Sequence, residues 1–196
     1  MLSVTFVRHG ETVANVGRII QGHSHGELTE RGISMAEHLG RHLSEEKFTR
    51  VFSSDLKRCH DTTRHILKHS SDGDVPEDLI VLDQVLREVC CGDLELQPES
   101  ELLKISRQTG LYFPFVQIPG GESFQDVKAR TGEFFNIVHS KKPGNLVITR
   151  RSIYVTLPRL PDSNAPDRYA SGKYARTRML PDRNASDTNA SVKYAS

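Results

Sequence analysis

The segment at residues 4–12, Val-Thr-Phe-Val-Arg-His-Gly-Glu-Thr, constrains the fold of this chain more than any other. Its short apolar run predicts a buried β-strand, and Gly10 ends that strand directly after Arg8 and His9. In an open α/β sheet, ligands bind at the carboxyl ends of the strands, where the chain turns toward a helix. At such a position a guanidinium neutralises phosphate oxygens while a neutral imidazole nitrogen attacks phosphorus. Taken alone, these residues fit a simple strand end, with His9 as its cap and Arg8 as a solvated charge, better than a phosphoryl-transfer site. The rest of the chain is needed to choose between the two interpretations.

Apolar runs alternate with helical periodicities from the N-terminus to residue 149. Thr29 is a typical N-cap for a helix that reaches about Leu43, and Ser54-Asp55 is a good cap for a helix over 56–69. This alternation is typical of βα units and favours an α/β fold with a mostly parallel sheet. The remaining elements are expected as strands at 50–53, 79–82 and 146–149, and as helices near 99–107 and from 124 onward.

The composition changes after the last expected strand. Residues 160–165 and 180–185 are near copies of each other, in a segment rich in Ser, Asn, Asp, Arg and Ala and poor in apolar periodicity. Two copies are too few for a repeat fold, which usually needs at least three units to bury a core. Charge divides here too: residues 1–150 hold 18 basic and 21 acidic residues, and the remainder hold 8 and 4. We expect a domain over 1–149 and a low-complexity, disordered tail over 150–196.

Composition excludes several classes of partner. A formal net charge of +1 implies no special attraction to nucleic acid or to a membrane surface, and no apolar stretch approaches the length of a membrane span. The three cysteines are an odd number and Cys90 and Cys91 are adjacent, which favours a reducing, cytoplasmic setting. The histidines are scattered, and His38 and His42 fit a solvated helix face better than a ligand pair. We expect a cytoplasmic protein with no metal, no other cofactor, and no nucleic-acid or membrane partner; protein partners stay open.

Four groups of residues follow one another, each at the end of an expected strand or in the adjoining loop. The groups are Arg8-His9-Gly10-Glu11-Thr12 with Asn15, Gln21-Gly22, Ser53–Arg58 and Leu86-Arg87-Glu88. Together they resemble the histidine phosphatase superfamily, which has the phosphoglycerate mutase-like fold. The resemblance covers residues 1–149 and implies a three-layer α/β/α architecture, incomplete at the C-terminus. It also implies that no metal is needed, because arginines supply the positive charge.

The resemblance implies a role for seven of these residues. His9 would be the nucleophile that becomes phosphohistidine, and Glu88 would protonate the leaving oxygen and then activate water. Positive charges and hydrogen bonds would hold the transferring phosphoryl group. This substrate-binding set comprises Arg8 and Arg58 as a clamp, and Asn15, Gln21 and Gly22 as hydrogen-bonding partners.

Six segments narrow the resemblance within the superfamily: Ile19–Gly22, Lys47–Thr49, Phe52–Leu56, Leu86–Glu88, Pro119–Ser123 and Gln125–Arg130. With them the chain most resembles fructose-2,6-bisphosphatases of the TIGAR type. Glu11-Thr12 also stands where cofactor-dependent mutases usually carry Gln-Ser, which favours a phosphatase over a mutase-like enzyme. The resemblance implies hydrolysis of a sugar phosphate in the regulation of glycolysis, with a small phosphorylated metabolite as the partner.

Several of these residues also have a structural interpretation. Taken singly, Arg58 could be a solvated helix charge. Glu88 could be a partner for Arg87, and Glu11 could begin a helix rather than serve a site. The order and spacing of Arg58 and Glu88 relative to His9 make these structural interpretations of the two residues less favoured. Four further basic residues could contact a second phosphate, although solvated helix charges fit them better: Lys104, Arg107, Lys128 and Arg130.

The match with the family breaks at residue 150. The family's second active-site histidine follows its late strand as His-Gly, whereas this chain has Arg150-Arg151, and its last histidine is His139. The family's final helix and strands are also missing, so we expect an open sheet edge, marginal stability and weak or no phosphatase activity. So abrupt a change suggests alternative splicing or a frameshift. Three hypotheses follow: a phosphatase, a chain that binds phosphate without turnover, and an unstable isoform with no molecular function.

Overall fold

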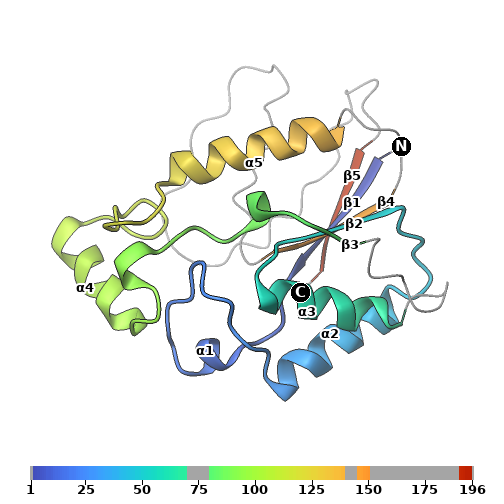
Figure 1. Cartoon of the computed structure of the whole chain (residues 1–196), viewed down its shortest axis with the longest axis horizontal. Coiled ribbons are helices and arrows are strands. Elements are labelled where there is room, and N and C mark those ends of the chain that lie inside the picture. The colour runs from blue at the N-terminus through green and yellow to red at the C-terminus, as the bar shows by residue number, and fades with distance from the viewer. Residues whose placement is uncertain (1, 70–79, 140–144, 151–189, 196) are drawn as a thin grey trace.

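The computed structural model describes residues 2–69, 80–139, 145–150 and 190–195. Within these ranges the chain forms an α/β fold around one five-stranded sheet in which every pairing is parallel (Figure 1), as the alternation of elements predicts. The strand order is β3-β2-β4-β1-β5. The strands are β1 (Leu2–Arg8), β2 (Arg50–Ser53), β3 (Ile80–Leu82), β4 (Asn145–Arg150) and β5 (Ala190–Ala195).

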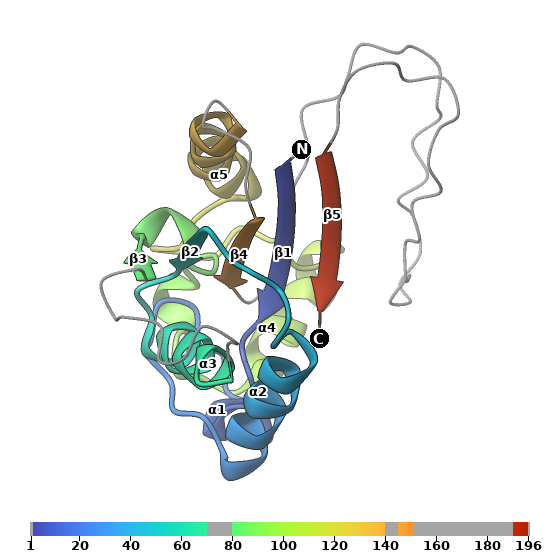
Figure 2. The same cartoon turned by 90° about the vertical axis from the view of Figure 1, so that its right-hand side faces the viewer.

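Helices cover both faces of this sheet (Figure 1; Figure 2). One face carries α2 (Glu30–His42) and α3 (Lys57–Leu67), and the other carries α5 (Phe124–His139). The side chains of β1 alternate accordingly, with Phe6 in the cluster beneath α5 and Val7 in the cluster beneath α2 and α3. A strand buried on both faces is a continuous apolar run, as the N-terminal segment is. The three-layer α/β/α architecture is therefore confirmed.

The start of one helix is confirmed and the start of another is not. Thr29 caps α2, its side chain accepting from the backbone N–H three residues on at 3.0 Å. The expected cap of α3 is wrong, because α3 begins after Leu56 with no side-chain cap. Ser54 Oγ accepts from the N–H of Leu56 at 3.3 Å, within the turn that leaves β2. Asp55 is engaged elsewhere, in an ion pair with Arg87.

A long excursion between β3 and α5 carries smaller elements. The expected helix near 99–107 is confirmed as α4, which lies beyond the end of the sheet (Figure 1). A short helix, α1, follows β1 and begins with a capping box formed by Thr12 and Asn15. The bounds are α1 (Val13–Val16), α4 (Glu99–Thr109) and two 3₁₀ turns at Gln84–Leu86 and Gly92–Leu94.

The C-terminal segment departs from expectation. Ala190–Ala195 forms β5, which pairs in parallel along β1 from Leu2↔Ala190 to Val7↔Ala195 (Figure 2). The expectation of disorder is therefore wrong for these six residues, and the open edge expected from the missing family strands is occupied beside β1. Val192 and Tyr194 have the β-branched and aromatic side chains that favour strands. Residues 151–189 lie outside the described residues.

No helix in the described ranges is both long enough and apolar enough to cross a membrane. Cys59, Cys90 and Cys91 are all thiols. In the same ranges, no group of three or more His, Cys, Asp or Glu side chains comes together in a way that would hold a metal ion.

Candidate active site

His9 lies immediately beyond β1, at the carboxyl edge of the sheet, and only 4% of it is exposed. Its Nδ1 lies 2.7 Å from the carbonyl oxygen of Gly10. A carbonyl oxygen only accepts hydrogen bonds, so Nδ1 carries the proton and Nε2 keeps the lone pair of the neutral ring. The turn therefore favours the tautomer in which Nε2 can act as a nucleophile.

The turn at Gly10 is attached to both helices on its side of the sheet. The Gly10 N–H donates to Thr62 Oγ1 at 3.0 Å, and Thr62 Oγ1 donates to the carbonyl of Arg58 at 2.7 Å, both within or beside α3. Gly10 also approaches α2 so closely that a Cβ would collide with the backbone carbonyl of Gly32. Only glycine fits there, and the position of the His9 ring is fixed by contacts to two separate elements.

Glu11 faces the start of α2. Its carboxylate accepts from Thr29 Oγ1 at 2.9 Å, its carbonyl accepts from the Thr29 N–H at 2.9 Å, and Arg31 lies 3.6 Å from its second oxygen. These contacts support the structural interpretation of Glu11, although it joins the start of α2 from outside rather than beginning a helix itself.

Arg58 is the largest fully buried side chain of the described residues, with 0% exposure. Its Nη2 donates to the Gly22 carbonyl at 2.8 Å, and its Nη1 donates to the Ser24 carbonyl. Its backbone N–H also donates to the His25 carbonyl at 3.2 Å. The interpretation of Arg58 as a solvated helix charge is therefore wrong. The guanidinium holds the loop at residues 22–25 against the start of α3.

Thr12 joins two residues of the expected substrate-binding set. It is fully buried, and its Oγ1 lies 2.9 Å from Asn15 Oδ1 and 3.0 Å from Gln21 Oε1. Gln21 is also fully buried, and its Nε2 amide finds no hydrogen-bond partner among the described residues. The adjoining Gly22 has φ +49°, a conformation that favours glycine, and a Cβ there would collide with the Glu95 carboxylate. Asn15, Gln21 and Gly22 thus lie in one connected loop region.

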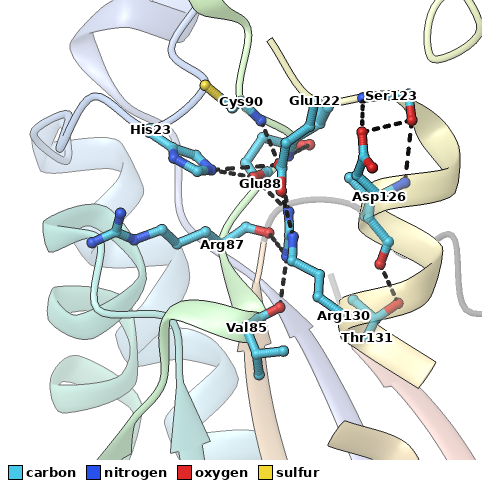
Figure 3. Close-up of polar contacts among 12 residues, drawn as sticks. His23, Val85, Arg87, Glu88, Cys90, Glu122, Ser123, Asp126, Arg130 and Thr131 are labelled. Carbon is cyan, nitrogen blue, oxygen red and sulfur yellow. Dashed lines mark hydrogen bonds and ion pairs between the residues drawn. The ribbon is translucent and has the colours of Figure 1, made fainter. Parts of the chain in front are cut away.

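Glu88 lies in the segment after β3, with 8% of it exposed. Its Oε1 accepts from the Val89 N–H at 3.1 Å. Its carbonyl oxygen accepts two further bonds, from His23 Nε2 at 2.9 Å and from Arg130 Nη2 at 3.0 Å (Figure 3). His23 follows Gly22 directly, so the loop that Arg58 holds on one side also contacts the Glu88 segment on the other.

Arg87 pairs with Asp55 and not with Glu88. Arg87 Nε donates to Asp55 Oδ1 at 2.7 Å, and Arg87 Nη2 donates to Asp55 Oδ2. The hydrogen-bonded guanidinium lowers the pKa of Asp55 below its ordinary value and raises the pKa of Arg87. This bidentate pair ties the end of β2 to the residue that precedes Glu88, so the alternative of an Arg87–Glu88 pair is wrong.

The lowered pKa of Asp55 predicts a pH-dependent contribution to stability. The ionised carboxylate stabilises the folded state above the unfolded pKa of Asp, about 3.9, and this contribution is lost as the pH falls through the lower folded value. Asp55→Asn should lower the free energy of unfolding at pH 7 by about 1 kcal/mol. The difference from wild type should shrink as the pH falls below the unfolded pKa of about 3.9. Urea unfolding at pH 7, 5 and 3 measures it, and a difference that stays constant with pH would contradict the assignment.

Arg130, expected as a second-phosphate contact or a solvated helix charge, is neither. From α5 its guanidinium reaches Glu122 and the carbonyls of residues 85–88 (Figure 3). Burial alone would raise the pKa of Glu122, but hydrogen bonds from Arg130 and from the Cys90 N–H lower it below its ordinary value. The Glu122–Arg130 pair is thus a charged, hydrogen-bonded junction beside Glu88.

The other expected basic contacts lie at the surface. Lys104 is exposed and pairs with Glu101 at 2.7 Å on α4, and Arg107 and Lys128 are exposed on their helices. Burial raises the pKa of Cys90, so this thiol stays protonated at neutral pH and does not compete with His9 as a nucleophile.

Arg8 and Arg150 end neighbouring strands. Arg8 is exposed at the end of β1, and the parallel register of β1 and β4 pairs it with Arg150. The carboxyl ends of parallel strands lie at one edge of a sheet, so residue 150 reaches the edge that His9 occupies. The strand expected to precede the family's second histidine is therefore in place, and it ends in arginine.

Six of the seven expected site residues are connected by hydrogen bonds through neighbouring groups, and Arg8 lies exposed at the same edge. Sequence reasoning did not single out the groups that make these connections. Thr62 stands one helical turn after Arg58, which is a signal for a shared face. His23, Glu122 and Arg130 carry no local signal for their partners. The residues missed are His23 and Thr62, while Thr12 and Glu122 belong to quoted motifs but were given no role there.

Comparison with known proteins gives consistent results. The chain is 41% identical over 135 residues to the fructose-2,6-bisphosphatase TIGAR of Xenopus tropicalis, a match that covers 68% of this chain and 48% of the relative. The chain thus spans about half the length of the curated relatives that it matches. The structure of an alpha-ribazole phosphatase from Shigella flexneri superposes with a TM-score of 0.62 at 28% identity, over 74% of this chain and 72% of that chain.

A more distant structure shows the same fold. The phosphoglycerate mutase from Bacillus anthracis str. Sterne superposes with a TM-score of 0.64 at 22% identity, over 75% of this chain and 74% of that chain. Residues 4–156 match the sequence model of the histidine phosphatase superfamily (branch 1). This range contains the His9 turn, the Arg58 helix and the Glu88 segment. The chain belongs to the histidine phosphatase superfamily, branch 1.

Proposed function

We propose that this chain transfers a phosphoryl group from a small phosphorylated metabolite to His9. The observation that carries the proposal is the Nδ1–H···O bond to Gly10, which leaves Nε2 of the buried ring as the nucleophilic nitrogen. Nε2 would attack phosphorus while Glu88 gives a proton to the departing oxygen. Glu88 would then take a proton from water, whose oxygen attacks phosphohistidine and releases phosphate, restoring His9.

The surrounding residues support the charge changes of this reaction. Arg8 stands at the end of β1, directly before His9, and the Arg58 guanidinium lies against the loop at residues 22–25. Cations fixed in this way stabilise the negative charge that spreads over the phosphoryl oxygens. The unsatisfied Nε2 amide of Gln21 is a further donor in the same loop region. We propose that these groups, with Asn15, bind the phosphoryl group.

The substrate class that fits best is a sugar phosphate. The relatives named as fructose-2,6-bisphosphatases share about 40% identity with this chain over its matched part. We therefore propose fructose-2,6-bisphosphatase-like hydrolysis in the cytoplasm, where the three cysteines would stay reduced as thiols. Slow turnover is part of the proposal, because Arg150 stands where the family has its second histidine. Phosphate binding without turnover is the second candidate, and the same substitution favours it.

Trapping of the phosphoenzyme tests the proposal. Purified chain mixed with ³²P-labelled fructose 2,6-bisphosphate and quenched in base should retain label that is lost in acid, as a phosphohistidine is. His9→Ala should abolish the label, whereas His65→Ala, which removes a half-buried histidine of α3 that lies 3.3 Å from Glu37 of α2, should retain it. Absence of label in wild type, or label that persists in His9→Ala, would refute transfer to His9. Binding of phosphate with neither label nor product would establish the second candidate.

A further inference from the structure

Arg130 uses every hydrogen-bond donor that it has. A guanidinium carries five N–H groups. The Nε group donates to Glu122 Oε1 at 2.8 Å and one Nη2 group to Glu122 Oε2 at 2.9 Å. The other Nη2 group donates to the Glu88 carbonyl at 3.0 Å, and Nη1 donates to the carbonyls of Val85 at 2.6 Å and Arg87 at 3.0 Å. No N–H group remains for a substrate phosphate, so the function of Arg130 lies in the segment that it holds.

Glu122 completes the junction. Its carboxylate accepts from the Cys90 N–H at 2.8 Å in addition to the two bonds from Arg130. His23 Nε2 lies 3.7 Å from the same carboxylate oxygen. The lowered pKa of Glu122 keeps it ionised at neutral pH, so the guanidinium is held by charge as well as by geometry. The pair thereby joins α5 to backbone groups on both sides of Glu88.

The backbone groups at and after Glu88 are held by several hydrogen bonds. Its carbonyl accepts from Arg130 and from His23, and the next two N–H groups, of Val89 and Cys90, are bound by the carboxylates of Glu88 and Glu122. In Figure 3 the side chain of Arg130 reaches this segment from α5, and the side chain of Arg87 extends to the opposite side. The Arg87 guanidinium donates to Asp55. The two ion pairs therefore brace Glu88 from two sides.

We propose that Arg130, held by Glu122, is a positioning residue that fixes the proton-donating carboxyl of Glu88 relative to the scissile bond. The proposal rests on the proposed function of Glu88. A misplacement of about 1 Å at a reacting group costs about 100-fold in rate. Positioning of the acid matters most for substrates whose leaving oxygen is strongly basic, because that oxygen must receive a proton as the bond breaks. A nitrophenolate leaves without that proton.

The test compares two substrates in the full chain. Arg130→Gln should lower kcat/KM for fructose 2,6-bisphosphate by about 100-fold but kcat/KM for p-nitrophenyl phosphate by no more than about 3-fold. Arg130→Lys, which keeps the charge but has fewer donors, should lie between wild type and Arg130→Gln. The matched control is Thr131→Val, which removes a buried hydroxyl that donates to the Val127 carbonyl at 2.7 Å within α5. This control should change both substrates equally.

Hydrogen exchange supplies a readout that does not depend on activity. In Arg130→Gln the amides of Val89 and Cys90 should exchange at least about 10-fold faster, while those of β1 and α3 stay as in wild type. An equal loss of kcat/KM with both substrates, or faster hydrogen exchange throughout the sheet, would overturn the positioning role. Arg130 would then only stabilise the fold in general. Unchanged exchange at Val89 and Cys90 would also overturn it. Failure of wild type to label His9 would refute the proposed function instead, with the exchange arm still deciding whether Arg130 fixes the Glu88 segment.

Discussion

Changing Arg150→His together with Arg151→Gly should raise the turnover of fructose 2,6-bisphosphate by about 100- to 1,000-fold, the size of effect of one well-placed donor to a developing charge. The register pairs residue 150 with Arg8, one residue before His9, so a histidine there would enter the edge of the sheet at which we propose the reaction occurs. An imidazole can donate to the phosphoryl group from this short distance. Arginine is longer and always charged, and it would have to fold back to do so. Steady-state release of inorganic phosphate measures the gain.

Two control variants separate this explanation from a general improvement in folding. Arg151→Gly alone should leave turnover near that of wild type, because it adds no donor. The double variant combined with His9→Ala should release no phosphate above background, since the gain depends on the nucleophile. An equal gain from Arg151→Gly alone, or no gain from the double change in a chain of unchanged thermal stability, would contradict the assignment of residue 150.

Arg58→Met should destabilise the chain by about 2–6 kcal/mol, because it removes the donors to two backbone carbonyls, each worth about 1–3 kcal/mol. The side chain is fully buried, and its loss would leave the carbonyls of Gly22 and Ser24 without the donors that now hold them. An unpaired buried carbonyl costs about 1–3 kcal/mol each. The loop at residues 22–25 should then lose its position, and with it the contact of His23 with the Glu88 carbonyl. Urea denaturation measures the stability change.

Phosphate binding should weaken along with stability in this variant. The rise in melting temperature that inorganic phosphate causes should disappear in Arg58→Met. In Arg58→Lys this rise should be smaller than in wild type, because lysine keeps the charge but not the forked geometry. Lys57→Met is the matched control, because Lys57 is exposed at the neighbouring position of α3 and pairs with Asp61 at the surface. Its effect should stay below about 1 kcal/mol. A comparable effect of both variants would argue against a specific role of Arg58 in the loop.

The parts of the fold that were predictable are those that leave a local pattern. The alternation of apolar runs and helical periodicities predicts where the first four strands lie along the chain, and Thr29 predicts the start of α2. β5 was not predictable from the residues near 190. This six-residue strand in a polar tail forms because it pairs with the edge of β1, which is distant in the sequence. Similarly, Ser54-Asp55 has the composition of a cap, but Asp55 is engaged by Arg87, 32 residues away.

By itself, the sequence determined the family, the strand that ends directly before His9, and the replacement of the second histidine by Arg150. Each of these follows from residues that are close together in the sequence or that occur in a fixed order along it. Only the tertiary structure decided what the charged groups do. Arg58 binds a carbonyl 36 residues earlier, and Arg130 binds one 45 residues earlier. Hydrogen bonds over such separations depend on how helices pack on the sheet, and no periodicity along the chain encodes them. Arg58 and Arg130, each of which could be a solvated helix charge when taken singly, are therefore distinguished by the carbonyl groups that each one reaches.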